Sequence, residues 1–535
     1  MRELRLVPSA LMVWAVTLTV LLGQLPLAVI LLVGVLTALV VCKQFGQSLM
    51  VFVLGIISLL VTWLRMRRAP EEIAVGTVTM SPTETETGYL VRLSAERNTY
   101  PVFVEELPEG IDTGSVVEID ARWSDSDLPS VAGVIGNGEV VSYTEAAGIA
   151  VHVSANFREV VQESVGEASQ GLIPGMVLGD TSLQDTAQQE LFIDTGLSHL
   201  SAVSGANVAI VLTAFFLLCR WMSLGPRVQA VVAGLALWGF IILVGTEPSV
   251  LRAGVAGVVG LLAVVNSSRA EPLHSLCLGI IGLIMWDSDM AASFGFALSA
   301  AATASIVVLT PMLHRVLTPL KWPDIVSRAL AVAIAADLAT MPIVALMAGE
   351  VSLVSVLVNV LVAPASAPIT VVGLIAAGLA QLPFDLPAAL LLKVVEPFTW
   401  WIYHIAAGAQ ELPISVIEAT PWAVLLAYGW IVAGLVCGHP RKTLGILAVL
   451  MVWGATDFSP KPDPVELTQV HTVNRDDDIA EVPADTQAIV VLDSAGQKSS
   501  RPVQTPEGIP VLYPNRDGEV TVYSDGTQHA ADGRF

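Results

Sequence analysis

Long apolar runs separated by short polar loops dominate this chain. Three runs open it, at about residues 9–22, 25–41 and 47–64, and about ten more follow between residues 196 and 456. A helix needs about 20 apolar residues to cross the roughly 30 Å hydrocarbon core of a bilayer. Several runs have only 16 or 17 residues, so we expect some to tilt or to form a hairpin. The pattern predicts a polytopic α-helical membrane protein with about 10 to 13 transmembrane segments.

Between the third and fourth runs the pattern changes to short stretches that alternate between apolar and polar residues. These are IAVGTVTM, GYLVRLSA, YPVFVEEL, SVVEIDARW and GEVVSYTE, separated by clusters of Gly, Pro and Asp. Such alternation, bounded by turn residues, is typical of β-strands. We therefore expect residues 69–146 to form a small all-β domain of about five strands. Its size suits an OB-like barrel, although other five-stranded folds would fit the same pattern.

Composition supports a membrane protein with polar attachments. The chain is 54% hydrophobic and 14% charged, and its mean hydropathy of +0.70 excludes an ordinary soluble domain. Its net charge of -22 is concentrated outside the apolar block. We divide the chain into N-terminal transmembrane segments (1–68), the β domain (69–146), an amphipathic linker (147–195), a transmembrane channel domain (196–456) and a short acidic C-terminal tail (457–535).

The charges of the loops predict an orientation in the membrane. One set of alternate loops contains Arg220, Arg227, Arg269, Arg315, Lys321, Arg328, Arg441 and Lys442. The other set, TEPS, DSD, AGE and QELPISVIEA, contains no Lys or Arg. Lys and Arg near membrane spans favour the cytoplasmic side. We therefore expect a multi-pass protein of the cell (plasma) membrane, with the β domain and the tail outside. Arg65, Arg67 and Arg68 depart from this pattern, because they follow the third run on the expected outer side.

Polar residues within or beside the apolar runs are the candidates for function. The stretch TGLSHLSAVSGANVAIV contains Gly196, Ser198, His199, Ser204, Gly205 and Asn207, and GTEPSVLRAG contains Glu247, Ser249 and Arg252. Small polar residues allow close helix packing or line a broken helix, and an arginine in a membrane is costly unless it is paired or solvated. The alternatives are ordinary helix packing for the first stretch and a snorkelling arginine paired with Glu247 for the second.

Two further stretches place polar residues in apolar surroundings. The first is FGFALSAAATASIVVLTP, residues 294–311. The second covers residues 335–380 and contains Asp337, Pro342, Pro364 and Pro368. Broken helices with a carboxylate build polar pathways through membranes, whereas a pair of ordinary spans is the simpler alternative.

Taken in order, these stretches resemble the ComEC family of competence proteins. The matching segments are GLIPGMVLGDTSLQD, GLSHLSAVSGANVAIV, EPSVLRA, FALSAAATASI and ADLATMPIVALMAGEVSLVSVLVNVLVAPASAPITVVGL. The resemblance covers about residues 170–380. It implies an inner-membrane channel that passes single-stranded transforming DNA into the cytoplasm, with an extracellular OB-like domain. Family members often have His and Gln where this chain has Asn207 and Asp337.

The tail departs from the family pattern. Members commonly continue into a metallo-β-lactamase-like domain with a cluster such as HxHxDH, but after the last apolar run only His471 and His529 occur here. Two distant histidines cannot assemble a two-metal hydrolase site. We therefore expect no enzymatic activity, no cofactor and no metal. The resemblance then implies a separate DNA receptor and nuclease, and the absence of a GxxxxGK[ST] motif implies a separate motor ATPase.

The identity of the cargo depends on the resemblance. Between residues 70 and 145 the chain has 15 acidic residues against Arg92, Arg97 and Arg122, so the average field there should repel phosphate. Asp337 and the pair formed by Glu247 and Arg252 would also fit a small-molecule or ion transporter. Such transporters usually contain inverted repeats, and the sequence has no convincing internal repeat.

Overall fold

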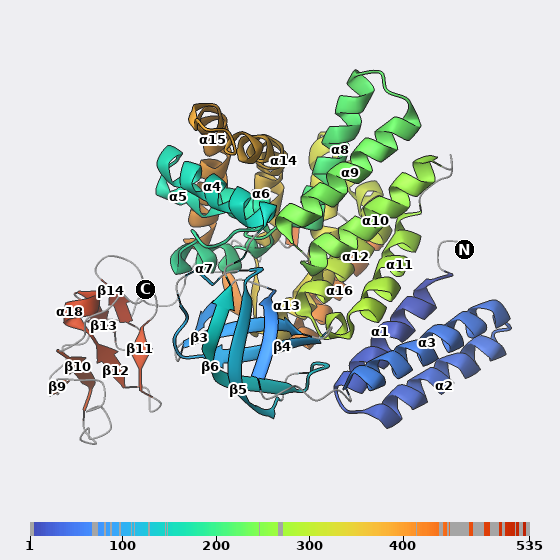
Figure 1. Ribbon diagram of the computed structural model, residues 1–535, viewed down its shortest axis with the longest axis horizontal. Coiled ribbons are helices and arrows are strands. Elements are labelled where there is room, and N and C mark those ends of the chain that lie inside the picture. Colours follow the sequence, from blue (N-terminus) through green and yellow to red (C-terminus); the bar gives the residue numbers. More distant parts are fainter. Residues whose placement is uncertain are drawn as a thin grey trace. The chain divides into compact units, whose positions relative to one another are not determined.

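The computed structural model divides into two compact units, Met1–Ala455 and Thr456–Phe535, which we describe separately (Figure 1). The described residues are 5–66, 73–79, 82–85, 88–95, 98–108, 110–111, 113–126, 129–144, 146, 148–245, 247–265, 271–412, 415–437, 442–443, 445–446, 449, 470–473, 486–492, 502–505, 509–518, 520–523 and 528–530.

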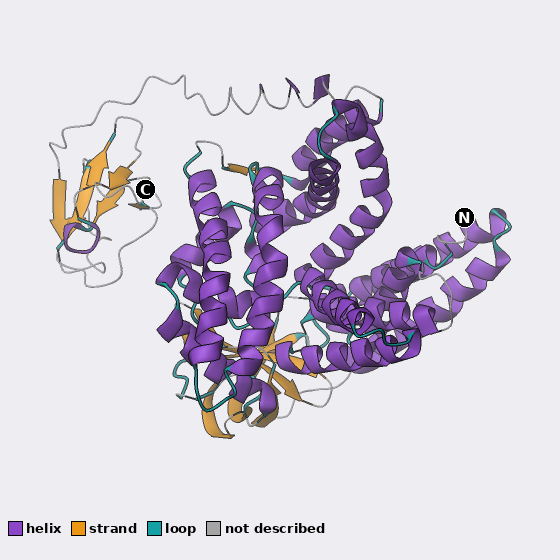
Figure 2. Ribbon diagram, turned by 90° about the horizontal axis from the view of Figure 1, so that it is seen from above, coloured by secondary structure: helices purple, strands orange, loops and turns teal. Residues whose placement is uncertain are grey.

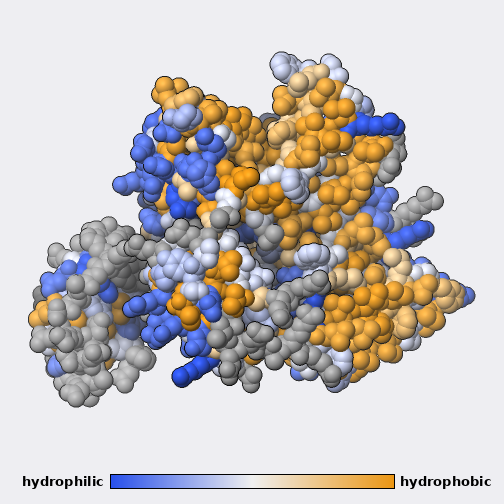
Figure 3. All heavy atoms as spheres, viewed as in Figure 1, coloured by the Kyte–Doolittle hydropathy of each residue, from blue (hydrophilic) through white to orange (hydrophobic). Residues whose placement is uncertain are grey.

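Three apolar helices open the first unit. They are α1 (Val7–Leu21), α2 (Leu25–Val41) and α3 (Phe45–Met66). Tight turns join them, with positive φ angles of 70° at Gly23 and 58° at Lys43. Their outward surface is almost entirely hydrophobic (Figure 3). An extended apolar surface of this kind is expected where lipid, not water, surrounds a protein.

Among the described residues of the predicted channel domain, nine α-helices follow. They are α8 (Gly205–Trp221), α9 (Pro226–Val244), α10 (Pro248–Val265), α11 (Pro272–Trp286), α12 (Phe294–Leu317), α13 (Asp324–Ala348), α14 (Ser355–Leu379), α15 (Leu386–Gln410) and α16 (Pro421–Val436). Among the described residues, six helices are long and apolar enough to cross a membrane: α3, α9, α10, α12, α13 and α14. The chain is thus a polytopic helical membrane protein. The expected run at 443–456 lies largely outside the described residues.

The prolines of the longest apolar run do not break its helix. Pro364 and Pro368 lie inside α14, which continues from Ser355 to Leu379. Pro342 likewise lies inside α13. The expectation of interrupted helices at these prolines was wrong. Proline removes one backbone hydrogen bond, but neighbouring helices and side chains can compensate for it within a membrane bundle.

The β domain is a closed barrel. Its strands are β1 (Ile73–Val78), β2 (Thr83–Thr85), β3 (Gly88–Ala95), β4 (Asn98–Val104), β5 (Val116–Asp125) and β6 (Val134–Thr144). The sheet order is β1-β5-β6-β4-β3-β2, and a further pairing of β1 with β3 closes it. Only the β4–β6 pair is parallel among these described strands. The five expected strands are all present, because alternate side chains such as Val91, Leu93 and Val102 fill the barrel interior.

Short helices connect the barrel to α8. They are α4 (Ile149–Ser164), α5 (Glu167–Gln170), α6 (Leu172–Leu178), α7 (Thr186–Asp194) and the 3-10 turn η1 (Ser198–Leu200). Phe157, Val160 and Val161 form the buried face of α4 and belong to the largest apolar cluster of the unit, which also includes residues of α14 and α15. The linker therefore packs into the helical region. Figure 2 distinguishes these helices from the barrel strands by colour.

The remaining strands form small sheets. In the first unit, β7 (Glu350–Ser352) pairs with β8 (Val416–Glu418). In the second unit, β9 (Val470–Val473), β10 (Ala488–Val491), β11 (Val503–Gln504) and β12 (Pro510–Leu512) form a sheet in the order β11-β12-β10-β9. The helix α18 (Pro514–Asp517) precedes a hairpin of β13 (Val520–Val522) and β14 (Gln528–Ala530).

Arg65, at the end of α3, binds the C-terminus of α11. Its guanidinium donates to the carbonyl oxygens of Met285 (3.0 Å) and Trp286 (2.8 Å) and to Ser288 Oγ (2.8 Å). The last carbonyls of a helix lack partners within the helix and carry its negative partial charge. Arg65 therefore neutralises a helix end, which gives this arginine a structural reason to depart from the loop-charge pattern.

The same junction reaches the barrel. The Val131 amide, in the loop between β5 and β6, donates to Asp289 Oδ1 at 2.5 Å. Asp289 lies in the 3-10 turn η2 (Ser288–Ala291) between α11 and α12. Burial raises the pKa of the Asp289 carboxyl to about 6, although the Val131 amide opposes this shift. The barrel and the DSD loop, which the loop charges assign to one side, are thus in direct contact.

Asp289 should make the stability of this junction depend on pH. Its pKa rises from 3.8 to about 6 in the folded chain, so the folded state binds the proton more tightly than the unfolded state. Stability should therefore fall as pH rises through this interval. We expect the unfolding temperature of the purified full chain to fall over this interval relative to Asp289→Asn, which keeps a carbonyl oxygen for Val131. Parallel pH profiles of the two proteins would contradict this assignment.

Candidate functional site

Side-chain hydrogen bonds bring the polar stretches together around the start of α8. Ser249 Oγ, on α10, donates to the Val203 carbonyl at 2.9 Å. Arg252 Nε, also on α10, donates to Ser299 Oγ of α12 at 2.9 Å. The Thr370 hydroxyl of α14 lies 3.4 Å from Asn207 Oδ1. Segments separated by up to 163 residues in the chain therefore share one polar junction.

The polar first half of TGLSHLSAVSGANVAIV lies outside the regular helix. Ser198 and His199 belong to η1, and the backbone at Ser204 is extended just before α8 begins at Gly205. The side chains of Ser198 and His199 are exposed, whereas Leu200, the third residue of η1, is buried. Protein nevertheless surrounds His199 closely enough to lower the pKa of its imidazole by desolvation, while a backbone hydrogen bond with Gly196 acts in the opposite direction. This part of the stretch is accessible to water or to a ligand.

Asn207, by contrast, is buried and hydrogen-bonds another part of the protein. Its side chain is 4% exposed, and its Nδ2 donates to the Met176 carbonyl at 2.9 Å. Met176 lies in the last turn of α6, where the backbone carbonyls accept no hydrogen bond from within the helix. Every residue of α6 is buried. Asn207 thus satisfies a buried helix end. This geometry favours the packing interpretation for Asn207 over contact with a cargo.

Glycines allow α6 to approach its neighbours closely. A Cβ atom on Gly175 would lie 2.6 Å from the Ser201 carbonyl oxygen. On α14, a Cβ on Gly373 would lie 2.5 Å from a methyl group of Val177. Both distances are shorter than van der Waals contact. The seven-residue helix α6 is therefore inserted tightly between the start of α8 and the middle of α14.

Gly196 connects the opening stretch to Asp337. Its φ of 71° is a left-handed conformation, and a Cβ there would lie 2.6 Å from Ser355 Oγ. Ser355 donates to Asp337 Oδ1 at 3.0 Å, and the Tyr428 hydroxyl donates to Asp337 Oδ2. Asn359 donates to the Gly196 carbonyl at 3.4 Å. Both oxygens of the Asp337 carboxylate therefore have protein donors, which join α13, α14 and α16.

Arg252 is a buried cation without a carboxylate partner in the described part of the chain. Its side chain is 7% exposed and lies against Gly205 and Gly279, where a Cβ would be 2.9 Å from Nη2 and 3.8 Å from Cγ respectively. The expected pair with Glu247 is not formed, since Arg252 binds Ser299 instead. Burial raises the pKa of the Glu247 carboxyl.

The structure thus brings some of the expected site residues together and leaves others apart. Gly196, Ser204, Gly205, Asn207, Ser249 and Arg252 lie at or beside the junction, and Asp337 joins it through Ser355. His199 hydrogen-bonds the Gly196 backbone, whereas Ser198 and Glu247 form no side-chain hydrogen bond with the others among the described residues. Sequence reasoning missed the roles of Ser299, Ser355, Thr370 and Tyr428. The first three lie in quoted stretches, but nothing in the sequence distinguishes them. No three His, Cys, Asp or Glu side chains gather as a metal site within the described residues.

Comparison with known proteins places these residues within one family. The sequence model of the family described as "Competence protein" matches residues 176–441, which include α8 to α16 and every expected site residue. A curated relative is "ComE operon protein 3" of Bacillus subtilis (strain 168), 26% identical over 196 residues. The alignment covers 37% of this chain and 24% of that protein, so the chain spans about a quarter of the relative's length. No solved structure matches. The chain belongs to the ComEC family of competence proteins.

Proposed function

We propose that this chain forms a membrane channel through which a single strand of transforming DNA enters the cytoplasm during natural competence. The convergence of the polar stretches on the start of α8 carries this proposal. The stretches that resemble the family lie far apart in sequence, yet they hydrogen-bond to one another inside a helical membrane protein. Intramembrane polar clusters are expensive to maintain, and they typically mark pathways for polar cargo.

The proposed path is closed in this conformation at α6. This helix is wholly buried, and Asn207 holds its C-terminal end. Ser198 and His199, on the turn η1 that follows α7, are accessible. A strand that enters beside η1 would have to displace α6. The plug, defined here as residues Leu172–Leu178, would then account for a membrane that remains sealed when no DNA is present.

The barrel is proposed to be an OB-type domain on the outer side. Renumbered without β2, its strand order is 1-2-3-5-4-1 with strands 3 and 5 parallel, which is the arrangement of OB folds. Such folds bind oligonucleotides on the face of strands 2 and 3. Here those strands are β3 and β4, whose outward residues include Arg92 and Phe103.

A row of outward side chains on this face suits a nucleic-acid strand. The register places Arg122 beside Asn137, Asn137 beside Phe103 and Phe103 beside Leu90. On the next row, Arg92 pairs with Pro101. Two of the three arginines of an acidic domain therefore flank one aromatic ring. A groove that combines cations with a stacking surface is typical of proteins that bind single strands.

The transporter alternative has less support. It depends on Asp337 as a site for an ion or a solute. Both oxygens of Asp337 accept hydrogen bonds from the protein, and the residue is 6% exposed. Asp337 therefore acts as a joint between helices. The partners follow from the channel proposal: single-stranded DNA and the lipid bilayer, with a separate receptor, nuclease and motor ATPase.

Asn207→Leu should impair DNA import. The change removes the donor to Met176 and leaves a buried carbonyl unsatisfied, at a cost of about 1 to 3 kcal/mol. Because this disturbs the polar junction at the start of α8, which lines the proposed path, we expect nuclease-protected internal DNA to fall by about tenfold at equal membrane levels. Thr213→Leu, on an exposed turn of the same helix, is the matched control. Normal import by Asn207→Leu would show that the bond from Asn207 to Met176 is not needed for transport.

Phe103→Ala should weaken the binding of single-stranded DNA to the purified full chain. Stacking of one base on an aromatic ring contributes about 1 to 3 kcal/mol, so the affinity should fall by about 5-fold to 150-fold. Tyr143→Ala, which removes an exposed aromatic ring near the end of β6, is the matched control. Titration of a fluorescent oligonucleotide measures both. An equal loss in the two variants, or none in either, would argue against this face of the barrel.

A further inference from the structure

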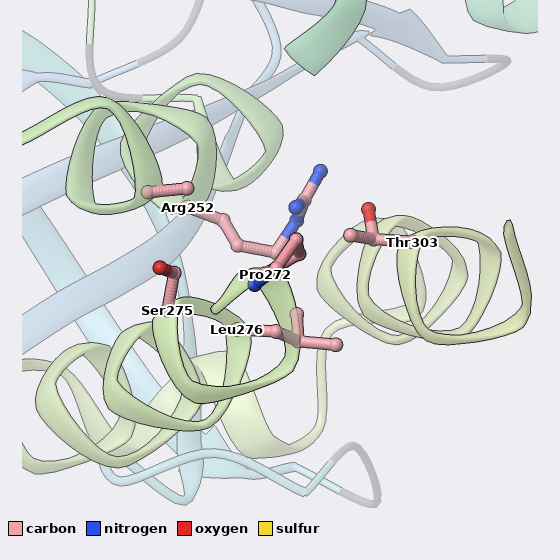
Figure 4. Close-up of a pocket in the computed structure, with 6 residues that line it drawn as sticks. Arg252, Pro272, Ser275, Leu276 and Thr303 are labelled. Carbon is pink, nitrogen blue, oxygen red and sulfur yellow. The ribbon is translucent and has the colours of Figure 1, made fainter. Parts of the chain in front are cut away.

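A cavity lies beside Arg252 between α10, α11 and α12. Its volume is about 220 Å³, and Arg252, Ala256, Pro272, Ser275, Leu276 and Thr303 line it (Figure 4). Since one water molecule occupies about 30 Å³ of the liquid, the cavity has room for a polyatomic group of several heavy atoms. The Arg252 side chain extends into the space between these helices, and Thr303 lies on the opposite wall (Figure 4).

The cavity contains an uncompensated positive charge. Arg252 is 7% exposed, and its only side-chain hydrogen bond with a described residue runs from Nε to Ser299 Oγ. Its terminal amino groups have no carboxylate or carbonyl partner among the described residues. A buried charge is strongly unfavourable unless it is paired and hydrogen-bonded. The cavity therefore favours an anion, which would provide the missing acceptors.

The surroundings of the guanidinium give this anion a specific chemistry. Gly205 and Gly279 leave room for the arginine side chain, because a Cβ on Gly205 would lie only 2.9 Å from Nη2. The Thr303 hydroxyl, on the opposite wall, makes no hydrogen bond with any described residue. A planar guanidinium fork together with one hydroxyl matches the several oxygens of a phosphate group better than a monatomic anion.

We propose that the Arg252 cavity binds one phosphodiester group of the DNA strand, with the guanidinium and the Thr303 hydroxyl as donors to its non-bridging oxygens. This inference rests on the proposed channel function. Ala256, Pro272 and Leu276 would contact the adjoining sugar. The cavity thus forms a phosphate-binding step on the path through the membrane.

The depth of the cavity favours a crossing strand over a lipid headgroup. The cavity extends from Pro272, at the start of α11, to Thr303. Thr303 lies in the interior of α12, a helix of 24 residues. At 1.5 Å per residue, nine residues of helix place it about 14 Å from the start of α12. Lipid phosphates lie at the surface of the bilayer, whereas a translocating strand presents phosphates at every depth.

The salt dependence of DNA binding tests this site. The full chain, held in nanodiscs of phosphatidylcholine, is titrated with a fluorescent 20-nucleotide single strand at several salt concentrations between about 50 and 200 mM. Each phosphate that a protein neutralises on a single strand contributes about 0.7 to the slope of log affinity against log salt. We expect Arg252→Gln to lower that slope by about 0.7 and to weaken binding. Arg252→Lys should retain the slope.

Two further variants separate the site from general effects of charge and folding. Arg220→Gln removes an exposed cation at the end of α8 and should leave the slope unchanged. Thr303→Val removes only the hydroxyl, so it should weaken binding without a change in slope. An uncharged methylphosphonate strand should bind the wild type and Arg252→Gln equally. These results together would support the site.

Other outcomes would overturn it. An unchanged slope in Arg252→Gln, or an equal loss in Arg220→Gln, would exclude a phosphate contact at Arg252. Phosphatidylglycerol that co-purifies with the wild type but not with Arg252→Gln, while DNA binding is equal, would identify a lipid site instead. If the intact chain restores DNA import to a deletion strain and Arg252→Gln does so equally, only this inference fails. If the deletion does not affect import, the channel itself fails.

Discussion

The need to satisfy every polar group inside a membrane protein governs this structure. Water is not available there to compensate an unpaired carbonyl, hydroxyl or charge. The start of α8 meets most of this requirement through long-range bonds: Asn207 to Met176, Ser249 to Val203 and Arg252 Nε to Ser299. Each of these bonds joins a different pair of segments. The polar groups therefore determine how α6, α8, α10 and α12 pack. The apolar surfaces alone would leave many such arrangements equivalent.

A second polar junction orders the parts around this centre. Arg65 occupies the C-terminal carbonyls of α11, and Asp289, one turn later, accepts the Val131 amide of the barrel. The N-terminal helices, the channel helices and the barrel therefore meet at one helix end. This contact holds the barrel near the loops on the predicted outer side, where an incoming strand would first meet the protein. In the proposed channel, the outward face of β3 and β4 and the turn η1 would then contact the strand in sequence.

The sequence predicted the elements well where local periodicity determines them. Apolar runs identified the long helices, and alternating stretches identified five of the six described strands of the barrel, because each pattern reflects which side of an element is buried. The three-residue strand β2 was missed, because it is too short to show an alternation. Local patterns could not identify long-range partners. Glu247 was the obvious neighbour for Arg252, yet Ser299, on another helix, holds the guanidinium. Pro364 and Pro368 indicated a broken helix, but α14 continues because its surroundings tolerate the missing hydrogen bonds.

The same distinction applies to the candidate site. Small residues at 196 and 205 indicated close packing, and the structure shows side-chain atoms within 3 Å of the position of each missing Cβ. Gly175 and Gly373, which the sequence did not single out, are packed as closely. The polar residues differ in exposure, and no local pattern in the sequence indicated this difference. Ser198 and His199 are exposed, whereas Asn207 is buried against α6. A residue's polarity shows that it needs a partner. Only the fold shows whether the partner is the protein or a ligand.

The central claim is that this chain carries DNA across the membrane, and one measurement tests it most directly. A strain that takes up DNA is deleted for this gene, and both surface-bound and nuclease-protected internal DNA are scored, with and without the intact chain restored. We predict that surface binding persists, that internal DNA disappears in the deletion, and that the intact chain restores it. Unchanged internal DNA in the deletion strain would contradict the account.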